Sequence, residues 1–154
     1  MIVIKKGDIA KLISKYKNNG CSIVFTNGCF DLLHAGHLDL LKRASEFGDK
    51  LIVGLNSDVS VKKLKGHSRP IEDESVRSNN LLDKSYVNDV VIFNELTPKK
   101  LIEQIIPDVL VKGGDYKKED IVGYKNVTKN GGAVRIVPLR PGFSTTLIIN
   151  KSNR

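Results

Sequence analysis

The chain has 154 residues, of which 40% are hydrophobic and 27% charged, the ordinary composition of a soluble globular protein with a core of its own. No apolar run has the length of a membrane span or of a signal peptide, so we expect no membrane partner. The formal net charge of +8 suits a nucleic-acid binder or an enzyme with polyanionic ligands. Because no arginine-rich run or zinc-finger spacing occurs, we expect no nucleic-acid partner.

The chain contains two cysteines, Cys21 and Cys29, which flank one predicted strand. They would lie near its opposite ends, too far apart to form a disulfide. Two free thiols indicate a reducing compartment, and we therefore expect a cytoplasmic protein.

Apolar runs and helical patterns alternate along the chain, beginning with a helix over about 8–18 for which Asp8 is the expected N-cap and Gly20 the stop. The predicted strands cover about 22–26, 51–55, 89–93, 108–112 and 133–137. The predicted helices run from the His37 region to about 48, then over about 58–64, 73–86, 98–106 and 118–129, with a last helix opened by Ser144.

This alternation predicts an α/β fold with a Rossmann-like, doubly wound parallel sheet of about five strands in three α/β/α layers. We expect a single domain over residues 1–154, with a helical lead-in over 1–20 and a C-terminal helix over 144–154. Ligands of such sheets bind beyond the carboxyl ends of the strands. The candidate site residues named below follow the carboxyl ends of the predicted strands.

The stretch IVFTNGCFDLLHAGHLDLL, residues 23–41, reads as strand, turn and helix, with His34 and His37 at the start of the helix. Free backbone N–H groups and the helix dipole favour an anion there, and two imidazoles three residues apart can both donate to one phosphoryl group. Gly36 leaves the space between the imidazoles and a phosphate open. The alternative is a buried polar turn whose histidines bond to backbone carbonyls.

The string HAGH, with GCFD immediately upstream, resembles the H-x-G-H signature of the nucleotidyltransferase superfamily of cytidylyltransferases and adenylyltransferases. Three further strings fit that resemblance. SVKKLKG, with Lys62 and Lys65, is either a solvated charged turn or a mobile clamp that closes over a triphosphate, and we favour the clamp. VKGGDY, residues 111–116, follows a strand and is either a glycine turn or part of a nucleotide pocket.

The third string is Arg140 followed by Ser-Thr-Thr at residues 144–146, which matches the second signature of these transferases. Ser144 and Thr145 would cap a helix and bind phosphate together. Arg77 matches an arginine found in relatives, although an ordinary surface arginine is nearly as good an interpretation.

From Thr26 onward the chain resembles the adenylyltransferase domain of bacterial ADP-heptose synthases, with the strings TNGCFDLLHAGH, VGLNSDVSVKKLKG followed by SRP, PDVLVKGGDY and STTLIINK in matching order. No kinase domain precedes it in this sequence, so we expect the stand-alone form. Departures from the family pattern are the polar stretch 77–80, Asn88 in place of a frequent aspartate, and His67 in place of a frequent acidic residue. The polar stretch should weaken the packing of its helix.

The resemblance implies transfer of a nucleotidyl group from ATP to a sugar 1-phosphate, D-glycero-D-manno-heptose 1-phosphate, to give ADP-heptose and pyrophosphate for lipopolysaccharide precursors. It implies Mg²⁺ held mainly by the substrate phosphates, with no metal ligands of the protein's own, and a homodimer. The catalytic residues that it implies are His34, His37, Lys62, Lys65 and Arg140. The implied nucleotide-binding residues are Thr26, Asn27, Gly28, Cys29, Phe30, Gly36, Arg77, Lys112, Gly113, Gly114, Asp115, Ser144 and Thr145. Asp31 and Tyr116 would bind the acceptor.

Two alternatives remain open from the sequence. One is a glycerol-3-phosphate cytidylyltransferase or a related enzyme that uses CTP or GTP. The other is a nucleotide- or RNA-binding module that keeps the fold without turnover, which the positive charge and the polar stretch 78–80 would suit.

Overall fold

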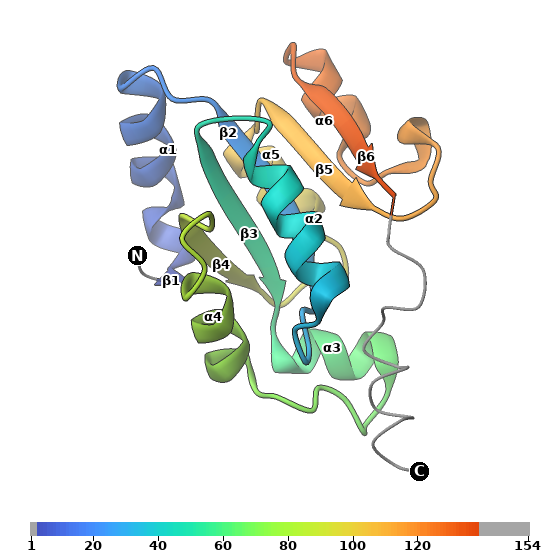
Figure 1. The fold of residues 1–154 in the computed structure, drawn as a ribbon. Helices are drawn as coiled ribbons and strands as arrows, with labels where there is room; N and C mark the ends of the chain where they lie inside the picture. The colour runs from blue at the N-terminus through green and yellow to red at the C-terminus, as the bar shows by residue number, and fades with distance from the viewer. Residues whose placement is uncertain (1–2, 139–154) are drawn as a thin grey trace.

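A computed structural model describes residues 3–138 of the chain (Figure 1). Within these residues six parallel strands form one sheet in the order β1-β4-β3-β2-β5-β6. The strands are β1 (Val3–Ile4), β2 (Ile23–Gly28), β3 (Lys50–Asn56), β4 (Asp89–Phe93), β5 (Val109–Gly113) and β6 (Ala133–Val137). The helices are α1 (Ile9–Asn18), α2 (Ala35–Ser45), α3 (Asp58–Lys65), α4 (Glu74–Leu82), α5 (Lys99–Ile105) and α6 (Tyr124–Lys129).

The order of the strands reverses beside β2. From β2 the chain proceeds outward through β3 and β4 on one side, then crosses over to β5 and β6 on the other. β2 and β5 pair through Val24 with Val109 and Phe25 with Leu110. In open parallel sheets the crevice beyond the carboxyl ends of two such strands is where ligands bind. The fold therefore places the ends of β2 and β5 at the expected position of a site.

The sheet has a helical layer on each face, because neighbouring side chains of a strand point to opposite faces. Ile23 and Phe25 of β2 belong to a core with the buried residues of α1, α5 and α6. Val24, between them, belongs to a second core with Leu41 of α2 and Leu81 of α4. Figure 1 shows α2 lying across the near face of the sheet, with α5 behind it. The predicted three-layer α/β/α fold class is confirmed.

The described elements differ from the prediction mainly at β1 and over residues 118–129. β1 lies inside the predicted helical lead-in, pairing Val3 with Val90, and a strand of only two residues has no periodicity to recognise. The predicted helix over 118–129 is instead a 3₁₀ turn followed by α6. Gly123 separates them at φ +93°, and a Cβ there would lie 2.8 Å from Ile102. The predicted C-terminal helix from Ser144 lies outside the described residues.

The polar departures from the family pattern have partners in the structure. The Ser78 hydroxyl donates to the carbonyl of Ser75, and Asn80 Nδ2 lies 3.5 Å from Glu72 Oε2. The Oδ1 atom of Asn88 accepts from the N–H of Leu51 at 2.8 Å, a role that needs an acceptor oxygen but no charge. Between residues 3 and 138, no helix is long and apolar enough to cross a membrane.

Candidate active site

The two motif histidines form the first turn of α2, where they cap the helix reciprocally. Nδ1 of His34 accepts from the N–H groups of Gly36 and His37 at 3.0 and 3.3 Å, and Nδ1 of His37 accepts from the N–H of His34 at 3.4 Å. The rings stack with their centroids 3.7 Å apart and their planes at 19°. The side chains thus satisfy backbone donors that a helix start would otherwise leave unpaired.

This cap decides where each imidazole carries its proton. A neutral imidazole has one donor and one acceptor nitrogen, so a ring that accepts at Nδ1 must be protonated at Nε2. In the neutral state both imidazoles therefore carry their proton on Nε2, which is a hydrogen-bond donor. The interpretation of the histidines as bonded to backbone carbonyls is wrong, because they accept from N–H groups instead.

Both imidazoles are neutral at physiological pH. The pKa of His37 is lowered from 6.5 to about 4, first by burial and then by the positive charges of His34 and Lys65, with Asp31 acting in the opposite direction. Burial also lowers the pKa of His34. A neutral imidazole can donate a hydrogen bond to an anion through the nitrogen that carries its proton.

The lowered pKa of His37 predicts a loss of stability in mild acid. The unfolded chain binds the proton at a higher pH than the folded chain, so the free energy of unfolding should fall as the pH drops from 6.5 toward 4. In a His37→Asn variant, we expect the drop in the free energy of unfolding over this pH range to be smaller than in the parent by about 1–3 kcal/mol. Urea titrations at several pH values measure it, with His67→Ala as the control at an exposed histidine. Parallel pH profiles for the parent and His37→Asn would contradict the expectation.

A cavity of about 160 Å³ opens beside His37, between the ends of β2 and β5, and His34 stacks on His37 without lining the cavity. The predicted site residues that it brings together are Asn27, Gly28, Cys29, Phe30, Asp31, His37, Lys65, Lys112 and Gly113. Leu40 of α2 also lines it and was not predicted, since its position in the helix looks like an ordinary core residue. Phe30 is buried and meets the edge of the His37 ring at a centroid distance of 5.5 Å. We call this space the histidine cavity.

A second cavity of about 160 Å³ shares Asn27 and Lys112 with the first. The predicted residue Tyr116 lines it, together with residues that the sequence did not single out: Pro98, Leu110, Asp120, Ile121 and Val122. Gly114, at φ +125°, lets the chain turn back so that the Tyr116 ring lies 5.4 Å from Lys112 Nζ. We call this space the tyrosine cavity. Burial lowers the pKa of Lys112 at the boundary of the two cavities.

The two predicted clamp lysines are helical, which corrects the prediction that they lie in a loop. Lys62 and Lys65 form the last turn of α3, where cations face the negative end of the helix dipole, and Gly66 ends the helix at φ +99°. Both are exposed, but Lys65 lines the histidine cavity and Lys62 does not. The loop proper begins at Gly66.

This difference predicts that the two lysines contribute unequally. Lys65→Ala should reduce kcat/KM by about tenfold or more, because it removes a cation from the wall of the histidine cavity. Lys62→Ala and Lys63→Ala should have smaller effects, and Lys63 serves as the matched control in the same helical turn. All three variants should melt near the parent, since solvated charges contribute little to folding. Equal kinetic effects at positions 62, 63 and 65 would mean that only the field of the whole turn matters.

Arg77 is completely buried, so its interpretation as a surface arginine is wrong. Its guanidinium donates to the carbonyl oxygens of Cys29, Asn56 and Glu72 and to Asp58 Oδ1, at distances of 2.7–2.9 Å. These bonds tie the turn after β2 to α3 and α4. Its predicted contact with nucleotide stays a prediction, and the structure gives it a role in holding that turn.

The remaining predicted residues are placed as follows. Thr26 is buried within β2, and Gly36 is buried in the first turn of α2. Asp115 is exposed after β5. Arg140, Ser144 and Thr145 lie outside the described residues. No group of three or more His, Cys, Asp or Glu side chains that could hold a metal ion occurs over residues 3–138.

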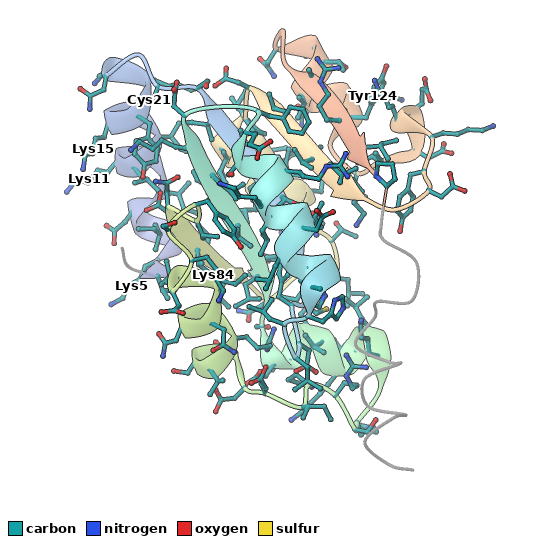
Figure 2. The ribbon with its side chains drawn as sticks, in the orientation of Figure 1. Lys5, Lys11, Lys15, Cys21, Lys84 and Tyr124 are labelled. Carbon is teal, nitrogen blue, oxygen red and sulfur yellow. The ribbon has the colours of Figure 1, made fainter. Side chains whose placement is uncertain are left out.

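Figure 2 shows the side chains of Lys5, Lys11 and Lys15 along the outer side of α1 and the segment before it, at a different edge of the molecule from the start of α2. All three are exposed. The positive charge of the chain is therefore not confined to the site, and among the described residues 3–138 the cationic residues in the wall of the histidine cavity are Lys65 and Lys112.

Comparison with known proteins assigns this site to a class. A family model described as cytidylyltransferase-like matches residues 25–151, and the parallel α/β fold agrees with it, so the chain is a nucleotidyltransferase. It belongs to the cytidylyltransferase-like family. The resemblance that the sequence motifs indicated is confirmed, and a binding module without turnover is no longer favoured.

The similar proteins include longer curated proteins and solved structures. The chain is 50% identical over 151 residues, 98% of its length, to "Bifunctional protein HldE" of Koribacter versatilis, and 48% identical over 149 residues, 97% of its length, to the protein of that name from Histophilus somni. It spans 31% of the length of each of these two relatives. The crystal structure of the lipopolysaccharide core biosynthesis protein from Thermoplasma volcanium matches with a TM-score of 0.64 and 28% identity, covering 79% of this chain and 98% of that one.

Proposed function

We propose that this nucleotidyltransferase transfers the adenylyl group of ATP to D-glycero-D-manno-heptose 1-phosphate, giving ADP-heptose and pyrophosphate for lipopolysaccharide precursors. The observation that carries nucleotidyl transfer is the stacked pair of neutral imidazoles, both with Nε2–H donors, beside a cavity that Lys65 and Lys112 also line. The motif resemblance to ADP-heptose synthases supports the sugar. The name of the Thermoplasma volcanium structure supports the pathway.

The reaction follows from this arrangement. An oxygen of the acceptor phosphate attacks the α-phosphorus of ATP, the bond to the β-phosphate oxygen breaks, and pyrophosphate leaves with the electron pair. The acceptor phosphate is an anion at neutral pH, so the protein does not need to supply a general base. His34 and His37 donate to phosphoryl oxygens as their negative charge grows, and Lys65 adds positive charge.

Two shallow cavities with a common wall fit a nucleotide that extends across them. We infer that the phosphates occupy the histidine cavity, while the base occupies the tyrosine cavity beside Ile121, Val122 and the Tyr116 ring. Mg²⁺ bound to the nucleotide would neutralise phosphate charge, and it would be held by phosphate oxygens, because hard cations keep oxygen ligands and water. We also expect a homodimer, for which sedimentation analysis is the direct measurement.

A substrate panel tests the proposal. ATP, CTP and GTP would each be combined with D-glycero-D-manno-heptose 1-phosphate or glycerol 3-phosphate, and pyrophosphate release would be followed. We expect the highest kcat/KM for ATP with the heptose phosphate. A preference for CTP with glycerol 3-phosphate would replace the proposal by the cytidylyltransferase alternative. The absence of pyrophosphate from every pair would refute the proposed substrates.

A further inference from the structure

Arg69, in the segment between α3 and α4, has a buried guanidinium with two nitrogens in different situations: Nε has a hydrogen-bond partner, and Nη2 has none within residues 3–138. The residue is 8% exposed, and its Nε donates to Asp31 Oδ2 at 3.1 Å. The Asp31 side chain is fully buried. The Nη2 atom of Arg69 is also buried, yet within residues 3–138 no oxygen accepts a hydrogen bond from it. A buried donor on a charged group is costly to leave unsatisfied, so each such atom calls for an explanation.

The guanidinium is held rigidly in place. The carboxylate of Asp31 binds Arg69 and also accepts from the N–H groups of Ile71 and Glu72, at 2.7 and 2.9 Å. Glu72 in turn accepts from the N–H of Leu32 through Oε1, at 3.0 Å. The segment 69–72 is thereby fastened to the turn after β2. A donor fixed in this way loses little conformational freedom when a ligand binds to it.

Arg69 does not itself line the histidine cavity, but it is bonded to a residue of the cavity wall. Its partner Asp31 lines that cavity, as does Cys29. Burial raises the pKa of the Cys29 thiol, while the positive charges of Lys65, Arg77 and Arg69 act against that rise. The charge of Arg69 is therefore felt inside the cavity although the side chain is buried.

The position of Arg69 distinguishes it from the nucleotide contacts. The tyrosine cavity lies on the side of β5 and α6, whereas Asp31 and Arg69 are fastened to the segment that leads into α4. An in-line displacement needs the acceptor and the leaving pyrophosphate on opposite sides of the α-phosphorus. An anion-binding donor on the α4 side is thus placed for the second substrate.

We propose that Arg69 determines acceptor specificity, with its Nη2 atom binding the phosphate monoester of the acceptor. This inference rests on the proposed function and names the residue that recognises its second substrate. Asp31 was predicted to bind the acceptor directly. Because Arg69 neutralises the charge of Asp31, the subsite instead offers a cationic hydrogen-bond donor. It should therefore select an acceptor with an anionic end group and disfavour one with a cationic end group.

The test compares two variants that retain the local hydrogen bonding with one distant control. Arg69→Lys keeps a cation beside Asp31 but removes the Nη2 donor of the guanidinium. The double variant Arg69→Gln, Asp31→Asn replaces the ion pair by two neutral side chains that can still hydrogen-bond to each other. Arg43→Gln is the control, because Arg43 is 48% exposed on α2 and contacts only Asp39 four residues earlier, at 3.8 Å. Circular dichroism and thermal melting establish that each variant is folded.

We expect both Arg69 variants to raise KM for the sugar 1-phosphate by about 10- to 100-fold, the loss of one charge-assisted hydrogen bond. The calorimetric Kd of ATP, measured without acceptor, should change by less than about twofold, since Arg69 does not line the histidine cavity in which we place the nucleotide phosphates. The control should match the parent in both measurements. A parallel loss of ATP affinity, or an unchanged KM for the acceptor, would overturn the proposal.

Inorganic phosphate separates this inference from the proposed function. Its affinity for the complex with a non-hydrolysable ATP analogue would be measured for the parent and for Arg69→Lys. Phosphate binding that is lost in the variant supports the subsite even where no sugar phosphate turns over, in which case only the proposed substrate fails. Phosphate binding equal in both proteins overturns the role of Arg69, whatever the turnover.

Discussion

Replacing His37 by Ala should lower kcat by about 10²–10³-fold, with a much smaller effect on ATP affinity. In the proposed mechanism the Nε2–H donor of His37 stabilises charge that grows as the pentavalent phosphorus forms, so its loss should affect the transition state more than the bound substrate. Steady-state pyrophosphate release gives kcat, and calorimetry gives the Kd of ATP. A rise in KM with an unchanged kcat would show instead that the histidine binds substrate and transition state equally.

His34 requires a second substitution, because it also caps α2. His34→Ala removes both the donor and the cap, and the loss of an N-cap alone costs about 0.5–2 kcal/mol. His34→Asn keeps an acceptor for the N–H groups of Gly36 and His37 but lacks the Nε2–H donor. We expect kcat to fall in both variants and the melting temperature to fall mainly in the alanine variant. The exposed His67→Ala is the control, with parental kcat and stability.

Replacing Arg77 by Met should lower the free energy of unfolding by roughly 3–5 kcal/mol, the usual result of removing one partner of a buried charge network. The side chain has no exposed surface, and its loss leaves Asp58 and three carbonyl oxygens without their donor. Urea denaturation measures the effect. Arg77→Lys should also destabilise, because an ammonium cannot reach four acceptors in a planar fork.

Asn79→Ala is the matched control, since Asn79 is exposed in the same helix and should change stability by no more than about 0.5 kcal/mol. Surviving Arg77 variants should also lose activity, because the bond from Arg77 to the Cys29 carbonyl fixes the turn that leads to the histidines. An Arg77→Met protein as stable as the parent would show that the network contributes nothing net to folding.

The parts of this protein that were predictable from sequence depend on local patterns. β4 and β6 have the predicted bounds, and Ser57 and Asp73 cap α3 and α4 through their side chains. The histidines were found because the signature fits within four residues. Asp8 shows the limit even of local rules, since it precedes α1 without making a capping hydrogen bond from its side chain.

The parts that were not predictable depend on contacts between distant residues. Arg69 and Asp31 are 38 positions apart, and Arg77 reaches Cys29 across 48. Nothing in the sequence around either arginine distinguishes it from a solvated one. The wall of the tyrosine cavity likewise joins Pro98 to Ile121 and Val122, whose apolar side chains look like ordinary core residues in the sequence. Lys62 and Lys65 were assigned to a charged turn, whereas α3 ends at Lys65, one residue beyond the predicted end, and Gly66 is its C-cap.

The reciprocal cap of α2 makes the integrity of the site inseparable from the first turn of a helix. The Nδ1 atoms that cap the start of this helix and the Nε2–H groups that we propose as donors to the substrate belong to the same two rings. If this first turn unfolds, both imidazoles lose the hydrogen bonds that fix their tautomers and their orientation. A molecule in which the start of α2 is unfolded therefore cannot have the site arranged for reaction. Amide hydrogen exchange at Gly36 and His37 therefore reports the fraction of molecules able to react, in the absence of any ligand.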